Sequence, residues 1–183
     1  MLPKFDELDN LQTNIERLVT GKYKVKMPEL IDTVLDFLIT AMLFGMEYTN
    51  KSLHTTKKLS TEAVEKIINK STAGETWQSR IEKYYATNDF GMFGTLLDTE
   101  SKRVFNESAF ETAKLNGATF KTWQTMEDLK VRDTHTFLQG VSLPIDEEFF
   151  TIDGDSALAP YGFSKPENVV NCRCYLEFRK QRE

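Results

Sequence analysis

The stretch Leu115-Asn-Gly-Ala-Thr-Phe-Lys-Thr-Trp-Gln-Thr125 decides the fold, because helical periodicity ends and strand-like composition begins within it. Before Gly117, apolar residues recur at the spacing of amphipathic helices. After this glycine, β-branched and aromatic residues predominate, as is typical of a strand. The sequence therefore predicts an α+β protein with a mainly helical region over residues 1–116 and a small α+β module over residues 117–183.

Upstream of this change, five segments combine helical periodicity with signals for helix ends. Ser60 is a suitable N-cap, and Pro28 stands where a first helical turn tolerates proline. Asn88 or Asp89 can cap the longest segment, and Gly21 offers a stop to the first one. The predicted helices cover residues 5–19, 29–51, 61–70, 75–85 and 89–115.

Downstream of Gly117, two strands are predicted, over residues 119–125 and 169–178, in a short antiparallel sheet. The segment between them holds several glycines and prolines and is expected to be mostly loop. Side chains alternate between the two faces of a strand. This alternation predicts a core face of Val170, Cys172, Cys174, Leu176 and Phe178, and a polar face that includes Asn171 and Arg173.

Composition limits the classes of function. The formal net charge is -5, and no segment carries the basic excess of a general DNA-binding surface. The most apolar run, Val34 to Met46, is too short to span a bilayer and is interpreted as a buried helix. The chain has only two cysteines and starts with nothing like a signal peptide, so we expect it to be made in a reducing cytoplasm.

The two cysteines have two interpretations. As neighbours on the core face of a strand, Cys172 and Cys174 are expected to act as small buried hydrophobes, with no metal or other cofactor. The alternative is a zinc-dependent interaction module in which His135 joins the two cysteines, although zinc takes four ligands.

A polar cluster is predicted where the long loop meets the last strand. Arg132 and His135 lie three residues apart, so a helical turn would place them on one side, facing Asn171 and Arg173. A hydrogen-bonded network that pins the loop is the favoured interpretation. A nuclease or toxin-like enzyme centred on His135 and Arg132 is the alternative, with histidine carrying protons and arginine stabilising charge.

One acidic turn and one set of ion pairs are interpreted as ordinary surface features. Asp153-Gly-Asp155, with the acids Asp146, Glu147 and Glu148, resembles half of a calcium loop but lacks the full ligand order, which favours a solvated acidic turn. Glu100, Arg103 and Glu107 have the spacing of ion pairs on a helix surface. The sequence also lacks the motifs of common ATPases, metalloproteases and esterases.

Several of these residues, in order, resemble a known family. The matching pattern is Lys121-x-Trp123, Asp128-x-Lys-Val-Arg132-x-x-His135-x-x-Leu138-x-Gly140, Asp146-Glu-Glu-Phe149 and Pro166-Glu-Asn-Val-Val-Asn171-Cys172-Arg173-Cys174, preceded by Thr99-Glu100, Arg103 and Asn106. Together these resemble the phage head morphogenesis family, the Mu F-like minor head proteins of tailed bacteriophages. The resemblance carries the predicted structural network of Lys121, Trp123, Asp128, Arg132, His135, Asn171 and Arg173.

The resemblance implies a minor capsid protein with no established catalytic activity. Such a protein would be assembled in the host bacterial cytoplasm and reside in the capsid interior of the virion. It would act at the portal vertex in head assembly and in DNA packaging or ejection. The implied partners are the portal protein and a major capsid or scaffold protein. Contact with packaged DNA would be local or indirect, and the helical region 1–116 is a candidate for docking on the portal.

Overall fold

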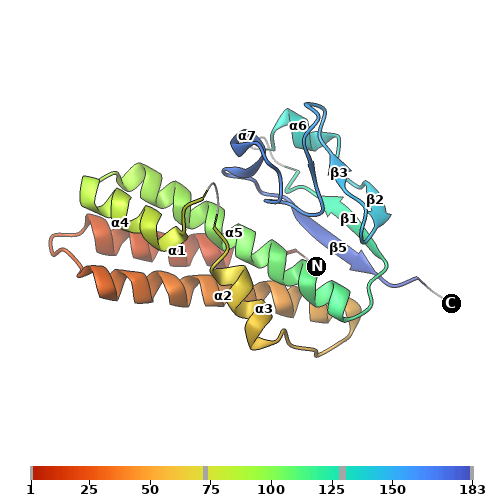
Figure 1. Ribbon diagram of the computed structural model, residues 1–183, viewed down its shortest axis with the longest axis horizontal. Coiled ribbons are helices and arrows are strands. Elements are labelled where there is room, and N and C mark those ends of the chain that lie inside the picture. The colour runs from red at the N-terminus through yellow and green to blue at the C-terminus, as the bar shows by residue number, and fades with distance from the viewer. Residues whose placement is uncertain (1, 72–73, 128–130, 182–183) are drawn as a thin grey trace.

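The fold is described from a computed structural model that covers residues 2–71, 74–127 and 131–181. Figure 1 shows long helices side by side in one part of the molecule and a small sheet module packed beside α5. All five predicted helices are confirmed, with ends that differ by a few residues. They are α1 (Phe5–Thr20), α2 (Met27–Leu53), α3 (Thr61–Ile68), α4 (Trp77–Thr87) and α5 (Phe90–Leu115).

Three of the helices begin at side-chain caps. The hydroxyl of Ser60 accepts a hydrogen bond from the backbone N–H of Ala63, and the carboxylate of Asp89 accepts one from Met92. Thr76 caps α4 in the same manner. These side chains satisfy N–H groups that a first helical turn leaves unpaired, and they thereby favour the observed starts of α3, α4 and α5.

Helices α2 and α5 cross at very close range and form the centre of the helical region. At the crossing, Ser108 donates a hydrogen bond to the Met42 carbonyl, 3.0 Å, and Thr49 donates one to the Ala109 carbonyl, also 3.0 Å. A β-carbon at Gly45 would overlap the backbone of Phe105. The close packing of α2 on α5 therefore depends on glycine at this position.

The module after α5 holds two small antiparallel sheets joined by long loops. The central strand of the larger sheet is β1 (Phe120–Gln124), which pairs with β2 (Ser142–Pro144) on one edge and β5 (Tyr175–Arg179) on the other. The smaller sheet pairs β3 (Phe149–Phe150) with β4 (Ser156–Ala157). Short helices α6 (Asp133–Thr136) and α7 (Pro166–Val169) complete the module and confirm the predicted α+β class.

The predicted strand over residues 169–178 is wrong in its first half. The helical turn α7 ends at Val169, and Asn171 adopts a left-handed conformation with φ 55°, which an extended strand excludes. Residues 170–174, here called the cysteine loop, therefore form an irregular loop, and Val170 lies at the surface rather than on the core face. Pro166 explains the helical turn, because its fixed φ suits a first helical position.

The helical region and the module share one hydrophobic core. Phe5 in α1 packs edge-on against Phe105 in α5 and against Tyr175 in β5, which also contacts Tyr48 in α2. The apolar faces of α2 are thus covered largely by α1, α5 and β5 within the chain itself. Among the described residues, no helix is long and apolar enough to cross a membrane.

Candidate functional site

The structure brings His135, Cys172 and Cys174 together beneath the surface of the module. His135 lies in α6, and both cysteines lie in the cysteine loop. The His135 Nδ1 atom is 3.6 Å from the Sγ of Cys172 and 3.5 Å from the Sγ of Cys174. All three ligand atoms lie within 4.8 Å of one another, and the side chains are at most 2% exposed.

An aromatic cluster surrounds the imidazole ring of His135. The ring contacts Trp123 edge-on at a centroid distance of 5.6 Å and tilts against Phe163 at 5.4 Å. The ring of Phe149 contacts Trp123 at a centroid distance of 5.1 Å and so joins the cluster. The Nε2 atom of His135 meets no hydrogen-bond partner among the described residues. The imidazole is therefore held in a buried, largely aromatic setting with its Nδ1 atom directed at sulfur.

Side chains from three distant segments hold the backbone of the cysteine loop. The Arg132 guanidinium donates hydrogen bonds to the Val170 carbonyl and to the last turn of α7. The Tyr161 hydroxyl donates to the Cys172 carbonyl, and Asn106 in α5 donates to the Cys174 carbonyl at 3.2 Å. Tyr161 is also buried with φ 69°, a conformation that bulky side chains rarely adopt. The two cysteines are thus positioned by the rest of the fold.

The two thiols titrate as a coupled pair. Burial opposes ionisation of both. Hydrogen bonds from the Cys174 thiol and from His135 nevertheless lower the pKa of Cys172 below its ordinary value. The pKa of Cys174 is raised by that same contact with Cys172 and by burial. The Trp123 indole N–H has no hydrogen-bond partner among the described residues. It lies near Cys174, however, and acts to lower the pKa of that thiol. The pair therefore holds one negative charge more readily than two.

Lys121, where the matching pattern in the module begins, is fully buried but lies apart from the group of His135, Cys172 and Cys174. Its ammonium group donates a 2.7 Å hydrogen bond to the Leu158 carbonyl and lies 5.1 and 5.2 Å from the ring centroids of Phe110 and Phe149. Burial lowers the pKa of Lys121 to about 8, although nearby carboxylates act in the opposite direction. The residue ties β1 to the loop after β4 rather than joining a network with His135.

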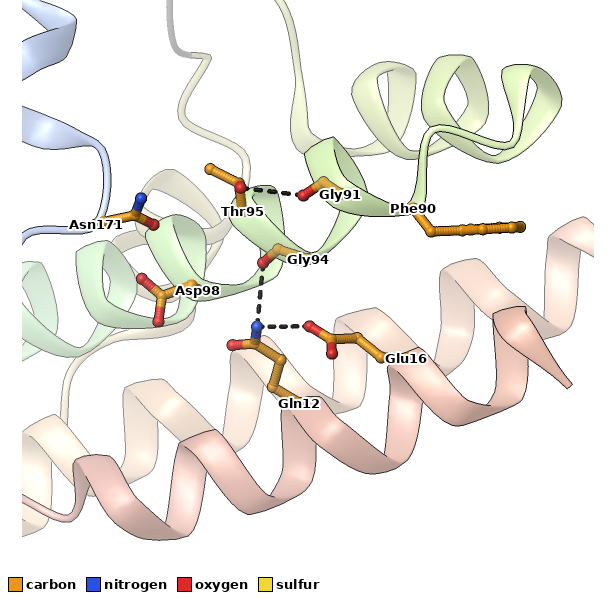
Figure 2. A pocket seen from close by; sticks show the side chains of 8 residues that line it. All are labelled: Gln12, Glu16, Phe90, Gly91, Gly94, Thr95, Asp98 and Asn171. Atoms are coloured by element: carbon orange, nitrogen blue, oxygen red, sulfur yellow. Dashed lines mark hydrogen bonds between the residues drawn. The ribbon is translucent and has the colours of Figure 1, made fainter.

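The other predicted network residues do not form a catalytic cleft. The Arg132 guanidinium binds backbone carbonyls, Asn171 is exposed, Arg173 is half-buried, and Asp128 lies outside the described residues. Asn171 lines a pocket of about 400 Å³ between α1 and α5. Figure 2 shows Gln12 and Glu16 of α1 facing Gly94 and Asp98 of α5 there, and His135 is not part of its lining. Among the described residues, His135 is buried at 1% exposure, whereas the nuclease hypothesis requires a histidine that a substrate can reach.

The acidic turn after β3, predicted to be solvated, is solvated only in part: Asp153 is exposed, but Asp155 is buried. Its carboxylate accepts hydrogen bonds from the backbone N–H groups of Ser164 and Lys165 and from the Asn168 amide, at 2.9–3.2 Å. Burial opposes the charge, but these donors lower the pKa of Asp155 well below its ordinary value. With its oxygens occupied in this manner, Asp155 fastens the long loop to the start of α7.

The predicted surface ion pairs of α5 are also buried. Glu100 and Arg103 are each 2% exposed and are joined by a 2.8 Å contact. Arg80 of α4 reaches Glu100 at 2.5 Å, and Arg103 also contacts Glu107 at 3.0 Å and the Ile67 carbonyl at 2.9 Å. Helical spacing identified the pairs within α5, but it carried no information on α3 and α4, which cover them.

Sequence reasoning missed Tyr161 and Phe163 altogether. Both lie in the loop between β4 and α7, where no periodic pattern distinguishes a buried aromatic residue from an exposed one. Asn106 was found only through the family resemblance, since its partner is the Cys174 carbonyl, 68 residues further along the chain.

Comparison with known proteins gives three results. The chain is 39% identical over 75 residues to an NAD(+)--arginine ADP-ribosyltransferase EFV of Enterococcus faecalis. The match covers 40% of this chain but only 15% of that protein. No solved structure matches the chain. The family described as phage Mu protein F like protein matches residues 57–177, from the segment before α3 to β5. Because this match covers more than half of the chain, the protein belongs to the phage Mu F-like family, whose role is in phage head morphogenesis.

Proposed function

We propose that this protein is a minor head protein of a tailed phage, located inside the capsid at the portal vertex. There it would act in head assembly and in DNA packaging or ejection. The observation that carries the proposal is the family match over residues 57–177, which includes α3, α4 and α5 together with the module that holds the cysteine loop, and leaves out α1 and α2. The match therefore concerns the module and three of the helices rather than a single motif.

The proposed partner is protein rather than DNA. A net charge of -5 repels packaged DNA, so contact with DNA would be local or indirect. Apolar side chains at the surface favour protein contacts instead. Phe137, Phe150 and Ile152 on the module are 68%, 68% and 63% exposed, and Leu43 on α2 is 52% exposed. The proposed partners are the portal protein and a major capsid or scaffold protein.

Co-purification tests the proposal. The tagged full-length chain is co-expressed with the portal protein of the same phage or prophage, and any complex is sized by multi-angle light scattering. The variants Leu43→Glu and Phe150→Glu place a charge on the helical region and on the module, and Ser52→Glu is a matched exposed control on α2. We expect a stable stoichiometric complex that one of the two apolar variants weakens and the control leaves intact. Absence of any complex with portal or capsid protein would contradict the proposal.

A structural role is proposed rather than a catalytic one. His135 is 1% exposed and its Nδ1 atom faces sulfur, an arrangement that gives a substrate no access to the histidine. The similarity to the ADP-ribosyltransferase covers 15% of that protein, which is compatible with a shared module and does not require a shared reaction. A plasmid-cleavage activity that co-purifies with the folded protein and disappears in His135→Ala would instead favour the enzyme.

A further inference from the structure

We propose that His135, Cys172 and Cys174 bind one zinc ion, which clamps α6 to the cysteine loop. The proposal goes beyond the role in head morphogenesis and does not depend on it. It rests on the positions of the three ligand atoms, on the hydrogen bonds that these atoms cannot all form with one another, and on the charge of the completed site.

The first argument is geometric. Zinc lies about 2.3 Å from a thiolate sulfur and about 2.0–2.1 Å from an imidazole nitrogen, so tetrahedral coordination separates nitrogen from sulfur by roughly 3.5–3.6 Å. The His135 Nδ1 atom lies 3.5 Å and 3.6 Å from the two sulfur atoms. Both nitrogen–sulfur distances therefore match a shared tetrahedral ion, and the two sulfur atoms lie within 4.8 Å of each other.

The second argument concerns hydrogen bonding. An imidazole nitrogen that accepts a hydrogen bond has one lone pair in the plane of its ring. Here two sulfur atoms approach Nδ1 at nearly equal distances, so a single lone pair, or a single N–H in the other tautomer, would have to serve both sulfurs. A metal ion removes this conflict, because it binds the nitrogen and both sulfurs at once. In that state Nε2 carries the ring proton as a buried donor without a partner among the described residues, which offsets part of this gain.

The third argument concerns charge. Binding releases one proton from each thiol, and the two thiolates then neutralise the two positive charges of the ion. A neutral site suits the buried aromatic setting between Trp123 and Phe163, where an uncompensated charge is costly. The thiolate and imidazole ligands favour zinc over magnesium or calcium, which prefer oxygen. With two cysteines in the whole chain, the four thiolates of an iron–sulfur cluster are not available.

The proposed role is structural. The ion would join residues 37 and 39 positions apart in the chain, across a loop-rich segment with little regular structure. A clip of this kind stabilises most where it closes a long loop. A water molecule would complete the tetrahedron. The three protein ligands are at most 2% exposed, which favours a structural ion over a catalytic one.

Metal analysis of the full-length protein tests the proposal. The wild-type chain is expressed in zinc-supplemented medium, purified without chelator, and analysed by inductively coupled plasma mass spectrometry. We expect about one zinc ion per chain and near-complete loss in the double variant Cys172→Ala/Cys174→Ala. His54→Asn is the matched control, because the second histidine of the chain is exposed, lies at the end of α2, and has a left-handed backbone that asparagine tolerates. The control should keep its zinc.

A second measurement uses only the wild-type chain, so it does not depend on the variants folding. The protein is stripped with a chelator, and zinc, cobalt(II) or magnesium alone is added back. Zinc should raise the melting temperature and magnesium should not. Cobalt should give the sulfur-to-cobalt charge-transfer band and the intense visible bands of a tetrahedral thiolate site. Zinc that the double variant retains, a wild-type chain without zinc, or cobalt bound without a charge-transfer band would each overturn the proposal.

Discussion

Replacing Glu100 by alanine tests whether the ion pairs of α5 are buried, as the structure has them, or exposed, as their spacing alone suggests. The carboxylate is 2% exposed and bridges two arginines, Arg80 at 2.5 Å and Arg103 at 2.8 Å. Removing one partner of a buried ion pair costs about 3–5 kcal/mol, because a buried charge loses its compensation. Arg103 keeps its contact with Glu107, so we expect the lower part of that range, about 3–4 kcal/mol.

Thermal and urea unfolding of the full-length chain would measure this loss. For a chain of this size, each kcal/mol lowers the melting temperature by about 2–4 °C, so Glu100→Ala should lower it by roughly 6–16 °C. Glu111→Ala is the matched control on the same helix, since its pair with Lys114 is 3.6 Å long and both side chains are more than 40% exposed. Both variants replace glutamate by alanine within α5, so helix propensity cancels between them.

The control should lose at most about 1 kcal/mol, as exposed pairs do. A double-mutant cycle with Arg80→Ala should give a coupling energy of about 1 kcal/mol or more, because the two side chains are in direct contact. If Glu100→Ala costs no more than Glu111→Ala, the burial of the network and the packing of α4 over it are refuted.

Three further predictions concern packing and pH. Gly45→Ala should destabilise the protein by about 2 kcal/mol or more, because a β-carbon would overlap the backbone of α5. Gly91→Ala on the open side of α5 is the control and should be neutral or stabilising. If urea unfolding gives the same change in stability for both variants, the close crossing of α2 and α5 is contradicted. Asp155 has a lowered pKa in the folded state, so its stabilisation is present above the unfolded pKa of about 3.9 and is lost as pH falls below it. Asp155→Asn should therefore be less stable than wild type at pH 7, and the difference in unfolding free energy should shrink in acid. A difference that stays constant between pH 7 and pH 3 would be evidence against the buried carboxylate. The pKa of Lys121 is lowered to about 8 in the folded protein, so this residue adds stability as pH rises from about 8 toward its unfolded pKa of about 10.4. Lys121→Met should lack this increase in unfolding free energy at alkaline pH. If the plots of unfolding free energy against pH are parallel for the two proteins from pH 7 to 10, the ammonium group is solvated.

Local sequence determined the elements whose physics is local. The cap Ser60, the cap at Asn88 or Asp89 and the change of composition after Gly117 indicate where α3, α5 and β1 begin, because their effects act within a few residues; the structure selects Asp89 as the cap of α5. The α+β class and the order of the elements follow from these signals. The family resemblance also came from sequence, because its pattern is an ordered set of residues along the chain and does not depend on how they fold.

Local alternation failed where distant groups decide the conformation. The segment 169–178 alternates like a strand, but its first half is drawn into a loop by hydrogen bonds from Arg132, Tyr161 and Asn106 to backbone carbonyls. Each of these donors comes from another part of the chain, and their combined effect outweighs the extended preference of the local sequence.

The candidate site depended most on tertiary structure. The sequence supplied its ligand types, His135, Cys172 and Cys174, and left open whether they meet. The fold decides that they do, because β1 and β5 pair side by side and thereby bring α6 and the cysteine loop, which lie at the same end of the two strands, close together. The burial of Glu100, Asp155 and Lys121 was likewise undetermined by sequence. The burial of a charged side chain depends on what packs over it, and here the covering groups come from segments far away in the chain.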